Sequence, residues 1–348
     1  MIERYTLSNG YSLARIIKGG WHLAGDHGAV DREQAIADMA LFVEAGITTF
    51  DCADIYTGVE QLIGDFRRAY PSLAPRIQVH TKLVPNLSEL HQVSGRMVED
   101  IIDRSLLRLG MERLDLVQFH WWDYKVPNYI ETALELERLR RAGKIARLGL
   151  TNFDTRRMAE IVAAGVSICA HQVQYSLLDE RPTEKMVDYC RAHDIVLLCY
   201  GTVAGGFLSE RWLGKSEPAP GSITNRSLIK YKLIIEDFGG WELFQELLTV
   251  LARIAARYDT DIASIASRAV LDRSQVAAII VGATNGSHLP ANAGITSLSL
   301  DPDDRAAIEA VTGRRTGPGG DVYSLERDRT SKHGSIMKYE LNTGSAKK

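Results

Sequence analysis

Short apolar runs alternate with longer amphipathic segments along most of the chain. We predict strands over eight of these runs, at 15–19, 47–51, 77–82, 115–120, 145–150, 168–174, 195–199 and 277–281. The segments between them repeat apolar residues at helical spacing and predict helices within 31–45, 58–70, 95–109, 129–142, 155–164, 182–193 and 241–273. Eight parallel strands joined by helical crossovers close into a ring. The predicted fold class is therefore α/β, a (β/α)8 TIM barrel.

Three segments lie outside this alternation. A β-hairpin is predicted at the N-terminus, because Asn9-Gly10 separates short strands at Tyr5–Leu7 and Ser12–Ile17. Residues 201–240 form a long connection rich in Gly, Pro and Ser, and residues 313–348 form a tail rich in Gly, Lys and Ser. Loops of such length usually serve a function or are disordered. We expect the long loops at the C-terminal face of the barrel, and a tail that is partly disordered or caps the mouth.

Length and charge narrow the class of protein. A chain of 348 residues suits one barrel domain over 1–312 with a C-terminal extension over 313–348. The formal net charge is −3 and no stripe of Lys and Arg is present, which argues against nucleic acid or an anionic membrane as a partner. The first residues do not resemble a signal peptide, and no apolar run reaches the roughly 18–20 residues that span a bilayer. We therefore expect a cytoplasmic protein.

Cysteines and histidines give no sign of a metal site. Cys52, Cys169, Cys190 and Cys199 are widely separated and lie in apolar stretches, which is typical of reduced core residues. The nine histidines form neither H-E-x-x-H nor a cluster with cysteines, so we predict no metal. A G-x-G-x-x-G that opens a helix after a strand is also missing, which disfavours a Rossmann nucleotide site.

Four polar residues follow three successive predicted strands at the end where barrels of this kind have their reactive groups. Asp51, Lys82 and His120 each end a predicted strand, and Tyr56 lies in the loop after Asp51. Taken singly, such residues are more often a turn cap, a lysine that reaches water and a packed histidine. Because a barrel brings its strand ends together around one axis, we predict that the four form one site.

These residue types suit the reduction of a carbonyl group. Hydride addition leaves negative charge on the carbonyl oxygen, so a proton donor must lie beside it. Tyrosine, whose usual pKa is about 10, becomes a useful donor when a cation stabilises its phenolate. In this reading Lys82 supplies the cation, Asp51 keeps the lysine charged, and His120 donates to the substrate oxygen.

Several motifs resemble those of the aldo-keto reductases and occur in that family's order. They are TTFDCADIYTGVE around Tyr56, TKL at 81–83, DLVQFHWWD at 115–123, GLTNF at 149–153, HQVQYSLLD at 171–179 and CYGTVAGGFLS at 199–209. The resemblance runs from about residue 4 to about residue 312. It implies that Tyr56 is the general acid and that Asp51, Lys82 and His120 complete a catalytic tetrad.

The resemblance also implies a nicotinamide cofactor across the mouth of the barrel. Thr151, Asn152 and Gln172 match residues that hold the nicotinamide carboxamide, and Tyr200 matches the ring that stacks on the nicotinamide. The loop Gly205-Gly206-Phe207-Leu208 matches one that covers the pyrophosphate. The full set of implied cofactor contacts is Gly20, Trp21, Thr151, Asn152, Gln172, Tyr200, Gly201, Gly206, Leu208, Gly282, Ala283, Thr284, His288 and Asn292.

The sequence departs from the family in VGATNGSHLPAN at 281–292. Members that prefer NADP usually have Lys or Arg here for the 2′-phosphate, whereas this segment has neither and offers only His288 as a potential cation. The cofactor is therefore NADP or NAD, with the preference open.

The sequence defines the substrate less well than it defines the catalytic residues. Trp21, Trp121 and Trp122 are candidates for the wall of a substrate pocket, although packing in the shell is an equal alternative for each of them. We expect reduction of an aldehyde or ketone, with a small-molecule carbonyl or alcohol as the partner and the oligomeric state open. The alternatives are an NAD-linked sugar or alcohol dehydrogenase and a nicotinamide-binding barrel without turnover.

Overall fold

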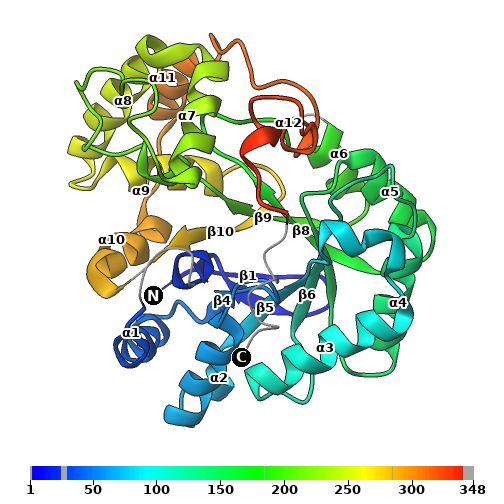
Figure 1. The fold of residues 1–348 in the computed structure, drawn as a ribbon. Helices are drawn as coiled ribbons and strands as arrows, with labels where there is room; N and C mark the ends of the chain where they lie inside the picture. Colours follow the sequence, from blue (N-terminus) through cyan, green and yellow to red (C-terminus); the bar gives the residue numbers. More distant parts are fainter. Residues whose placement is uncertain (1, 25–29, 184, 284, 340–348) are drawn as a thin grey trace.

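Eight parallel strands close into one barrel (Figure 1). The computed structural model describes residues 2–24, 30–183, 185–283 and 285–339. Around the barrel, the strands are β10 (Val276–Gly282), β3 (Ile16–Gly19), β4 (Thr49–Asp51), β5 (Gln78–Leu83), β6 (Leu116–Phe119), β7 (Leu148–Thr151), β8 (Ile168–Gln174) and β9 (Val196–Tyr200). Neighbouring strands are parallel throughout, from the pair of β3 and β4 to the closing pair of β10 and β3. The predicted (β/α)8 TIM barrel is confirmed.

The N-terminal hairpin packs against the barrel at the ends where its strands begin. Strand β1 (Arg4–Thr6) pairs antiparallel with β2 (Ser12–Ala14), and Gly10 turns between them at φ 79°. The predicted strand 12–17 is in fact divided, because the chain leaves the hairpin at Arg15 and enters the barrel as β3. Leu7, Tyr11 and Leu13 form one buried cluster with barrel residues, so the opposite end of the barrel is the one that can hold a site.

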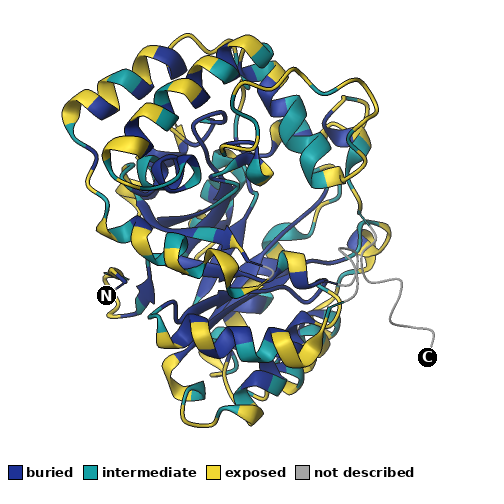
Figure 2. Ribbon diagram, turned by 90° about the vertical axis from the view of Figure 1, so that its left-hand side faces the viewer, coloured by how far each residue is buried: buried dark blue, intermediate teal, exposed yellow. Residues whose placement is uncertain are grey.

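Helices surround the barrel, with exposed residues on their outer sides (Figure 2). They are α1 (Arg32–Glu44), α2 (Val59–Ala69), α3 (Gly95–Leu109), α4 (Tyr129–Arg141), α5 (Thr155–Ala163), α6 (Lys185–Ala192), α7 (Arg226–Phe238), α8 (Gly240–Arg257), α9 (Ile262–Leu271), α10 (Leu289–Gly294), α11 (Pro302–Thr312) and α12 (Ser324–Arg327). Capping side chains set several starts: the side chains of Asp31, Ser94 and Asp154 each accept a hydrogen bond from an amide in the first turn. No helix of the described residues is long and apolar enough to cross a membrane.

Two predicted segments differ in detail from the structure. The single helical segment expected over 241–273 is two helices, because Asp259 adopts a left-handed φ of 49° and Asp261 caps the start of α9. The long connection over 201–240 contains α7, whose first turn is capped by Asn225. Apolar residues of α7, α8, α9 and α11 form a second core beside the barrel.

The chain after α11 returns to the mouth of the barrel. Asp321 accepts hydrogen bonds from the amide and hydroxyl of Thr155, at the start of α5. His333 contacts Asp237 of α7 at 2.6 Å. We call residues 321–339 the C-terminal strap, because this segment connects α5 with α7 across the rim; residues 340–348 lie outside the described part of the chain.

Candidate active site

Asp51, the last residue of β4, forms a buried ion pair with Lys82 of β5. The Lys82 ammonium donates to Oδ2 of Asp51 at 2.6 Å and to the carbonyl oxygen of Cys52 at 2.8 Å, and both side chains of the pair are 5% exposed. Burial alone lowers the pKa of a lysine, but the Asp51 carboxylate more than offsets this effect, so the pKa of Lys82 is raised above its usual value. Lys82 therefore stays charged at neutral pH.

Tyr56 lies beside this cation. The Lys82 ammonium is 4.9 Å from the centroid of the Tyr56 ring, and Trp21 packs edge-on against that ring at a centroid distance of 5.0 Å. Burial raises the pKa of the Tyr56 hydroxyl, and the charge of Lys82 offsets part of the rise. The phenol thus keeps its proton at neutral pH and has a neighbouring cation that stabilises the phenolate.

Gly20 brings the loop after β3 directly onto Asp51. Its amide donates to the Asp51 carbonyl oxygen at 2.7 Å. A Cβ atom on Gly20 would lie 2.8 Å from that oxygen and 2.8 Å from Cγ1 of Val59. Glycine is therefore required for this close approach, which places Trp21 next to Tyr56.

His120 follows β6 and is neutral. Burial and the positive charge of Arg327 lower the pKa of His120 to about 3. Nδ1 of His120 lies 3.0 Å from the carbonyl oxygen of Thr151. A carbonyl oxygen only accepts, so Nδ1 has the proton and Nε2 has a lone pair. The expectation that His120 donates to a substrate oxygen does not fit this pattern, since Nε2 is an acceptor; it has no hydrogen-bond partner among the described residues.

Two glutamine amides complete the hydrogen bonding of Asp51. Its Oδ1 accepts from Nε2 of Gln172 at 2.6 Å and from Nε2 of Gln118 at 3.0 Å. The amide nitrogen of Gln172, a predicted cofactor contact, is thus turned toward the ion pair. Gln118 is not among the predicted site residues; the signal that points to it is its position two residues before His120, on the same face of the strand.

The ends of β7, β8 and β9 are joined by hydrogen bonds along one side of the rim. The Tyr200 hydroxyl donates to Oδ1 of Asn152 at 2.9 Å, and the backbone amide of Asn152 donates to the backbone carbonyl oxygen of Gln172 at 3.0 Å. Asn152 has a left-handed φ of 59°, which asparagine tolerates better than most residues. The structure therefore brings together four predicted cofactor contacts: Thr151, Asn152, Gln172 and Tyr200.

The loop after β9 has two glycines with left-handed backbones. Gly201 has φ 75° and Gly206 has φ 96°, and the direction in which a Cβ on Gly206 would project is open. The Leu208 side chain is fully buried in the core beneath α7 and α8. Only the backbone of Leu208 is therefore available to contact a cofactor.

The predicted cofactor contacts after β10 differ in how far they are buried. Gly282 is exposed at the strand end, His288 is exposed, and Nδ2 of Asn292 is buried without a partner among the described residues. Ala283 is buried, and its carbonyl oxygen accepts from the ammonium of Lys18 at 3.3 Å. Burial lowers the pKa of Lys18 to about 8. Lys18 is a cation at this end that the sequence does not reveal, because it comes from β3. Thr284 lies outside the described residues.

The predicted pocket tryptophans occupy different surroundings. Trp122 packs edge-on against the His120 ring at a centroid distance of 4.4 Å and donates its indole hydrogen to the Pro85 carbonyl at 2.9 Å. Trp121 is fully buried, and its indole donates to the carbonyls of Asp123 and Val126. The structure therefore assigns Trp121 to the packed shell, not to a pocket wall.

The C-terminal strap, predicted only as a tail that is partly disordered or caps the mouth, contributes Arg327 and Tyr323, which the sequence analysis did not name as site residues. The Arg327 guanidinium donates to the carbonyl oxygens of Trp121, Trp122 and Asn152, which belong to the loops after β6 and β7. The Tyr323 ring packs edge-on against His120 at a centroid distance of 5.6 Å. These contacts join segments about two hundred residues apart, and no local sequence pattern reports them.

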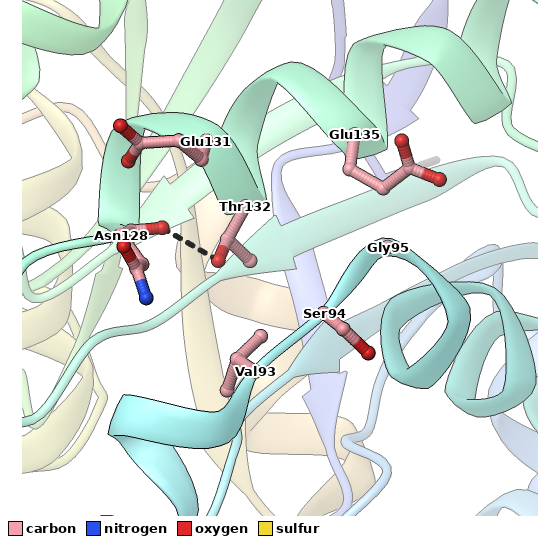
Figure 3. Close-up of a pocket in the computed structure, with 7 residues that line it drawn as sticks. All are labelled: Val93, Ser94, Gly95, Asn128, Glu131, Thr132 and Glu135. Carbon is pink, nitrogen blue, oxygen red and sulfur yellow. Dashed lines mark hydrogen bonds between the residues drawn. The ribbon is translucent and has the colours of Figure 1, made fainter.

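A separate pocket of about 180 Å³ lies between the starts of α3 and α4 (Figure 3). Its lining includes Ser94, Asn128, Glu131 and Glu135, and none of its seven lining residues belongs to the cluster around Lys82. Two carboxylates make this pocket a poor place for an anionic cofactor. Within the part of the chain that the structure describes, no group of three or more His, Cys, Asp and Glu side chains is placed to hold a metal ion.

Comparisons with known proteins show the family and the fold. The sequence pattern of the Aldo/keto reductase family matches residues 15–312. The aldo-keto reductase YhdN of Bacillus subtilis (strain 168) is 26% identical over 314 residues, which cover 87% of this chain and 91% of that protein. The NADH-specific methylglyoxal reductase of Escherichia coli (strain K12) is 24% identical over 322 residues, covering 86% of this chain and 95% of that protein.

Two further similarities differ in extent. Flagellar radial spoke protein 5 of Chlamydomonas reinhardtii is 27% identical over 299 residues, and the match covers 69% of this chain but only 56% of that protein. Among solved structures, the glycerol dehydrogenase AKR11B4 from Gluconobacter oxydans superimposes with a TM-score of 0.76 at 22% identity, covering 92% of this chain and 97% of that one. The structural similarity concerns the fold.

Proposed function

Since the chain belongs to the Aldo/keto reductase family of oxidoreductases, we propose that it reduces a small aldehyde or ketone with a nicotinamide cofactor and that Tyr56 supplies the proton. The observation that carries this proposal is the position of the Tyr56 ring 4.9 Å from the buried ammonium of Lys82, which Asp51 keeps charged. A phenol beside a permanent cation is a proton donor with a stabilised conjugate base.

The described residues fit a nicotinamide cofactor across the mouth. Asn292 has a buried amide nitrogen without a partner in the described ranges, and Gly206 leaves open the space that a Cβ would fill. Thr151 and Tyr200 end β7 and β9 at the same face of the barrel, and the Tyr200 hydroxyl donates to Asn152. When bound, the cofactor supplies or accepts the hydride.

The protein residues then manage the proton and the geometry. As hydride reaches the carbonyl carbon, negative charge grows on the oxygen, and the Tyr56 hydroxyl transfers its proton to that oxygen. The Lys82 ammonium lowers the energy of the resulting phenolate, and Asp51 with its two glutamine partners holds the ammonium in place. The phenolate regains its proton from solvent at the mouth.

The state of His120 favours a second candidate, oxidation of an alcohol with NAD. Nε2 of His120 is a hydrogen-bond acceptor, and a carbonyl substrate has no proton to donate to it, whereas an alcohol has one. In this direction the substrate hydroxyl donates its one proton to Nε2 of His120, and the protonated Tyr56 hydroxyl donates a hydrogen bond to the same substrate oxygen; as hydride leaves the carbon, the hydroxyl proton passes to His120.

The test is a comparison of both directions with the purified protein. Butanal is offered with NADH or NADPH, and 1,2-propanediol is offered with NAD or NADP, while absorbance at the reduced-nicotinamide band is followed. Faster aldehyde-dependent oxidation of the reduced cofactor supports the reductase, and faster diol-dependent reduction of the oxidised cofactor supports the dehydrogenase. Cofactor binding without turnover of these substrates, or of the acidic and aromatic aldehydes used below, contradicts both and supports a non-catalytic barrel.

A further inference from the structure

Lys230 of α7 presents an ammonium group to a ring of tyrosines at the mouth. Its Nζ lies 5.3 Å from the centroid of Tyr200, 5.7 Å from that of Tyr231 and 5.8 Å from that of Tyr323, and its side chain is 16% exposed. An ammonium has three hydrogens to donate, yet Lys230 makes no hydrogen bond within the described ranges. A largely buried ammonium whose hydrogens have no acceptor is destabilising unless an anion binds to it.

The carboxylate closest to Lys230 is already bound elsewhere. Glu326 lies 4.0 Å from Nζ, beyond hydrogen-bond distance. Both oxygens of Glu326 accept from the guanidinium of Arg181, at 2.9 and 3.0 Å, and the same guanidinium also binds Asp179. Glu326 therefore attracts the Lys230 ammonium but accepts no hydrogen bond from it. Burial lowers the pKa of Lys230.

Tyr323 connects this ammonium with His120. The Tyr323 ring contacts the His120 ring edge-on at 5.6 Å on one side and lies 5.8 Å from Nζ of Lys230 on another. Its backbone has a left-handed φ of 60°, which is rare for a bulky residue and is kept only where the surroundings enforce it. Arg327, whose guanidinium is 5.4 Å from the same ring, donates to backbone carbonyls and pairs with no carboxylate among the described residues, so it adds a second positive charge here.

We propose that Lys230 binds an acidic group of the substrate, so that the substrate is a small carbonyl compound, or its alcohol, that also has a carboxylate or a phosphate. This inference rests on the proposed function, because it places the acidic group one tyrosine ring away from His120. The acidic group replaces water at the ammonium and uses its free hydrogens. The acid and the carbonyl are then separate groups of one substrate, because the Tyr323 ring contacts both the His120 ring and the Lys230 ammonium.

The test uses two matched pairs of aldehydes, each with and without a carboxylate: succinic semialdehyde with butanal, and 4-carboxybenzaldehyde with benzaldehyde. The kcat/KM of wild type, Lys230→Met and Lys232→Met is measured for all four. Lys232 is the matched control, because it lies on the same helix but its ammonium pairs with Glu217 and Glu236. We expect Lys230→Met to lower kcat/KM for the two acidic aldehydes by roughly 10- to 100-fold, through KM, the effect of one lost charged hydrogen bond. The neutral aldehydes and Lys232→Met stay within about twofold of wild type.

Several results overturn the inference. Equal losses for acidic and neutral aldehydes in Lys230→Met would make Lys230 a structural counter-ion of Glu326. Weaker binding of the nicotinamide cofactor to the variant would place the ammonium on the cofactor phosphates. The wild type offers a test that does not depend on how the variant folds: it must prefer each acidic aldehyde over its neutral partner, and added KCl must reduce this preference.

Failure of the proposed function looks different from failure of the inference. If wild type reduces none of the four aldehydes with either cofactor and oxidises none of the corresponding alcohols, the proposed function fails and the inference falls with it. If wild type reduces butanal and benzaldehyde but shows no preference for the acidic partners, only the inference fails.

Discussion

The ammonium of Lys82 lies 2.6 Å from Oδ2 of Asp51, and both side chains are almost completely removed from water. Because the two charges are buried as a pair, the loss of either one leaves the other uncompensated. We predict that Asp51→Asn lowers the free energy of unfolding by about 3–5 kcal/mol at pH 7, the usual effect of breaking a buried pair. Urea unfolding followed by far-ultraviolet circular dichroism measures the change.

The pH dependence of this variant provides a second check on the same pair. Without the carboxylate, burial lowers the pKa of Lys82 in the folded state below the value of about 10.4 found in unfolded chains. The unfolded state then binds more protons, so the stability of Asp51→Asn relative to wild type rises as the pH is increased from 7 to 9. A deficit that is independent of pH would contradict the assignment of a charged Lys82.

Neutral buried histidines should make the fold sensitive to acid. The pKa values of His120 and His171 are lowered to about 3, and that of His80 to about 4, in each case mainly by burial. A histidine with a lowered folded-state pKa stabilises the protein above its unfolded pKa of about 6.5, and this stability is lost as the pH falls toward the folded value.

The expected slope can be tested at one position. Each buried histidine costs about 1.4 kcal/mol of stability per pH unit below pH 6. The glutamine of His171→Gln can still donate to the Phe153 carbonyl that His171 contacts. We predict that this variant loses about 1.4 kcal/mol less stability per pH unit than wild type between pH 6 and pH 4.5. Urea unfolding at several pH values measures the slope, and an unchanged slope would mean that His171 is not neutral in the folded protein.

Arg327 should hold the C-terminal strap on the mouth. Its guanidinium donates to three carbonyl oxygens of the rim, and a hydrogen bond from a charged group contributes about 1.5–3 kcal/mol. We predict that Arg327→Met increases the rate of chymotryptic cleavage within 321–339 at least about tenfold and raises the KM for the carbonyl substrate. The control is Arg329→Met, because Arg329 pairs with Asp123 at the exposed surface, where such a pair contributes about 0–1 kcal/mol. Equal cleavage of the two variants would contradict the role of Arg327 in holding the strap on the mouth.

Cofactor preference follows from the segment after β10. No Lys or Arg occurs in 281–292, His288 is exposed, and the Lys18 ammonium is directed at the Ala283 carbonyl. We predict that NADH binds at least as tightly as NADPH, since a 2′-phosphate gains no guanidinium or ammonium partner from this segment. Titration with each cofactor, followed by quenching of tryptophan fluorescence, gives the two dissociation constants. NADPH binding more than tenfold tighter would show that Lys18 or another cation serves the phosphate.

The barrel and its central cluster are visible in the sequence because both are recorded locally. Each strand is a short apolar run between turn residues, and Asp51, Lys82 and His120 stand at the ends of such runs. Parallel strands then bring these ends together, whatever the details of the loops. The break between α8 and α9 is less visible, because the apolar spacing continues across Asp259 and only its left-handed backbone ends the helix.

The contacts that the prediction lacks join residues far apart in the chain. Arg327 reaches the carbonyl of Trp122 across 205 positions, and Arg181 reaches Glu326 across 145. The proton position on His120 is also a product of the fold, because it depends on the Thr151 carbonyl and on the charge of Arg327. Composition and periodicity describe single elements, so pairings of this kind become apparent only in three dimensions.

The central claim is that Tyr56 supplies the proton, and Tyr56→Phe tests it most directly. The substitution removes one hydroxyl and keeps the ring that packs against Trp21. Wild type, Tyr56→Phe and the control Tyr70→Phe, whose ring stacks on Phe66 away from the cluster, are compared by single-turnover oxidation of bound reduced cofactor with an aldehyde, alongside a cofactor titration. We predict that Tyr56→Phe slows turnover by about 10²- to 10⁴-fold with an unchanged cofactor dissociation constant, while Tyr70→Phe matches wild type. Turnover of Tyr56→Phe at the wild-type rate would contradict the account.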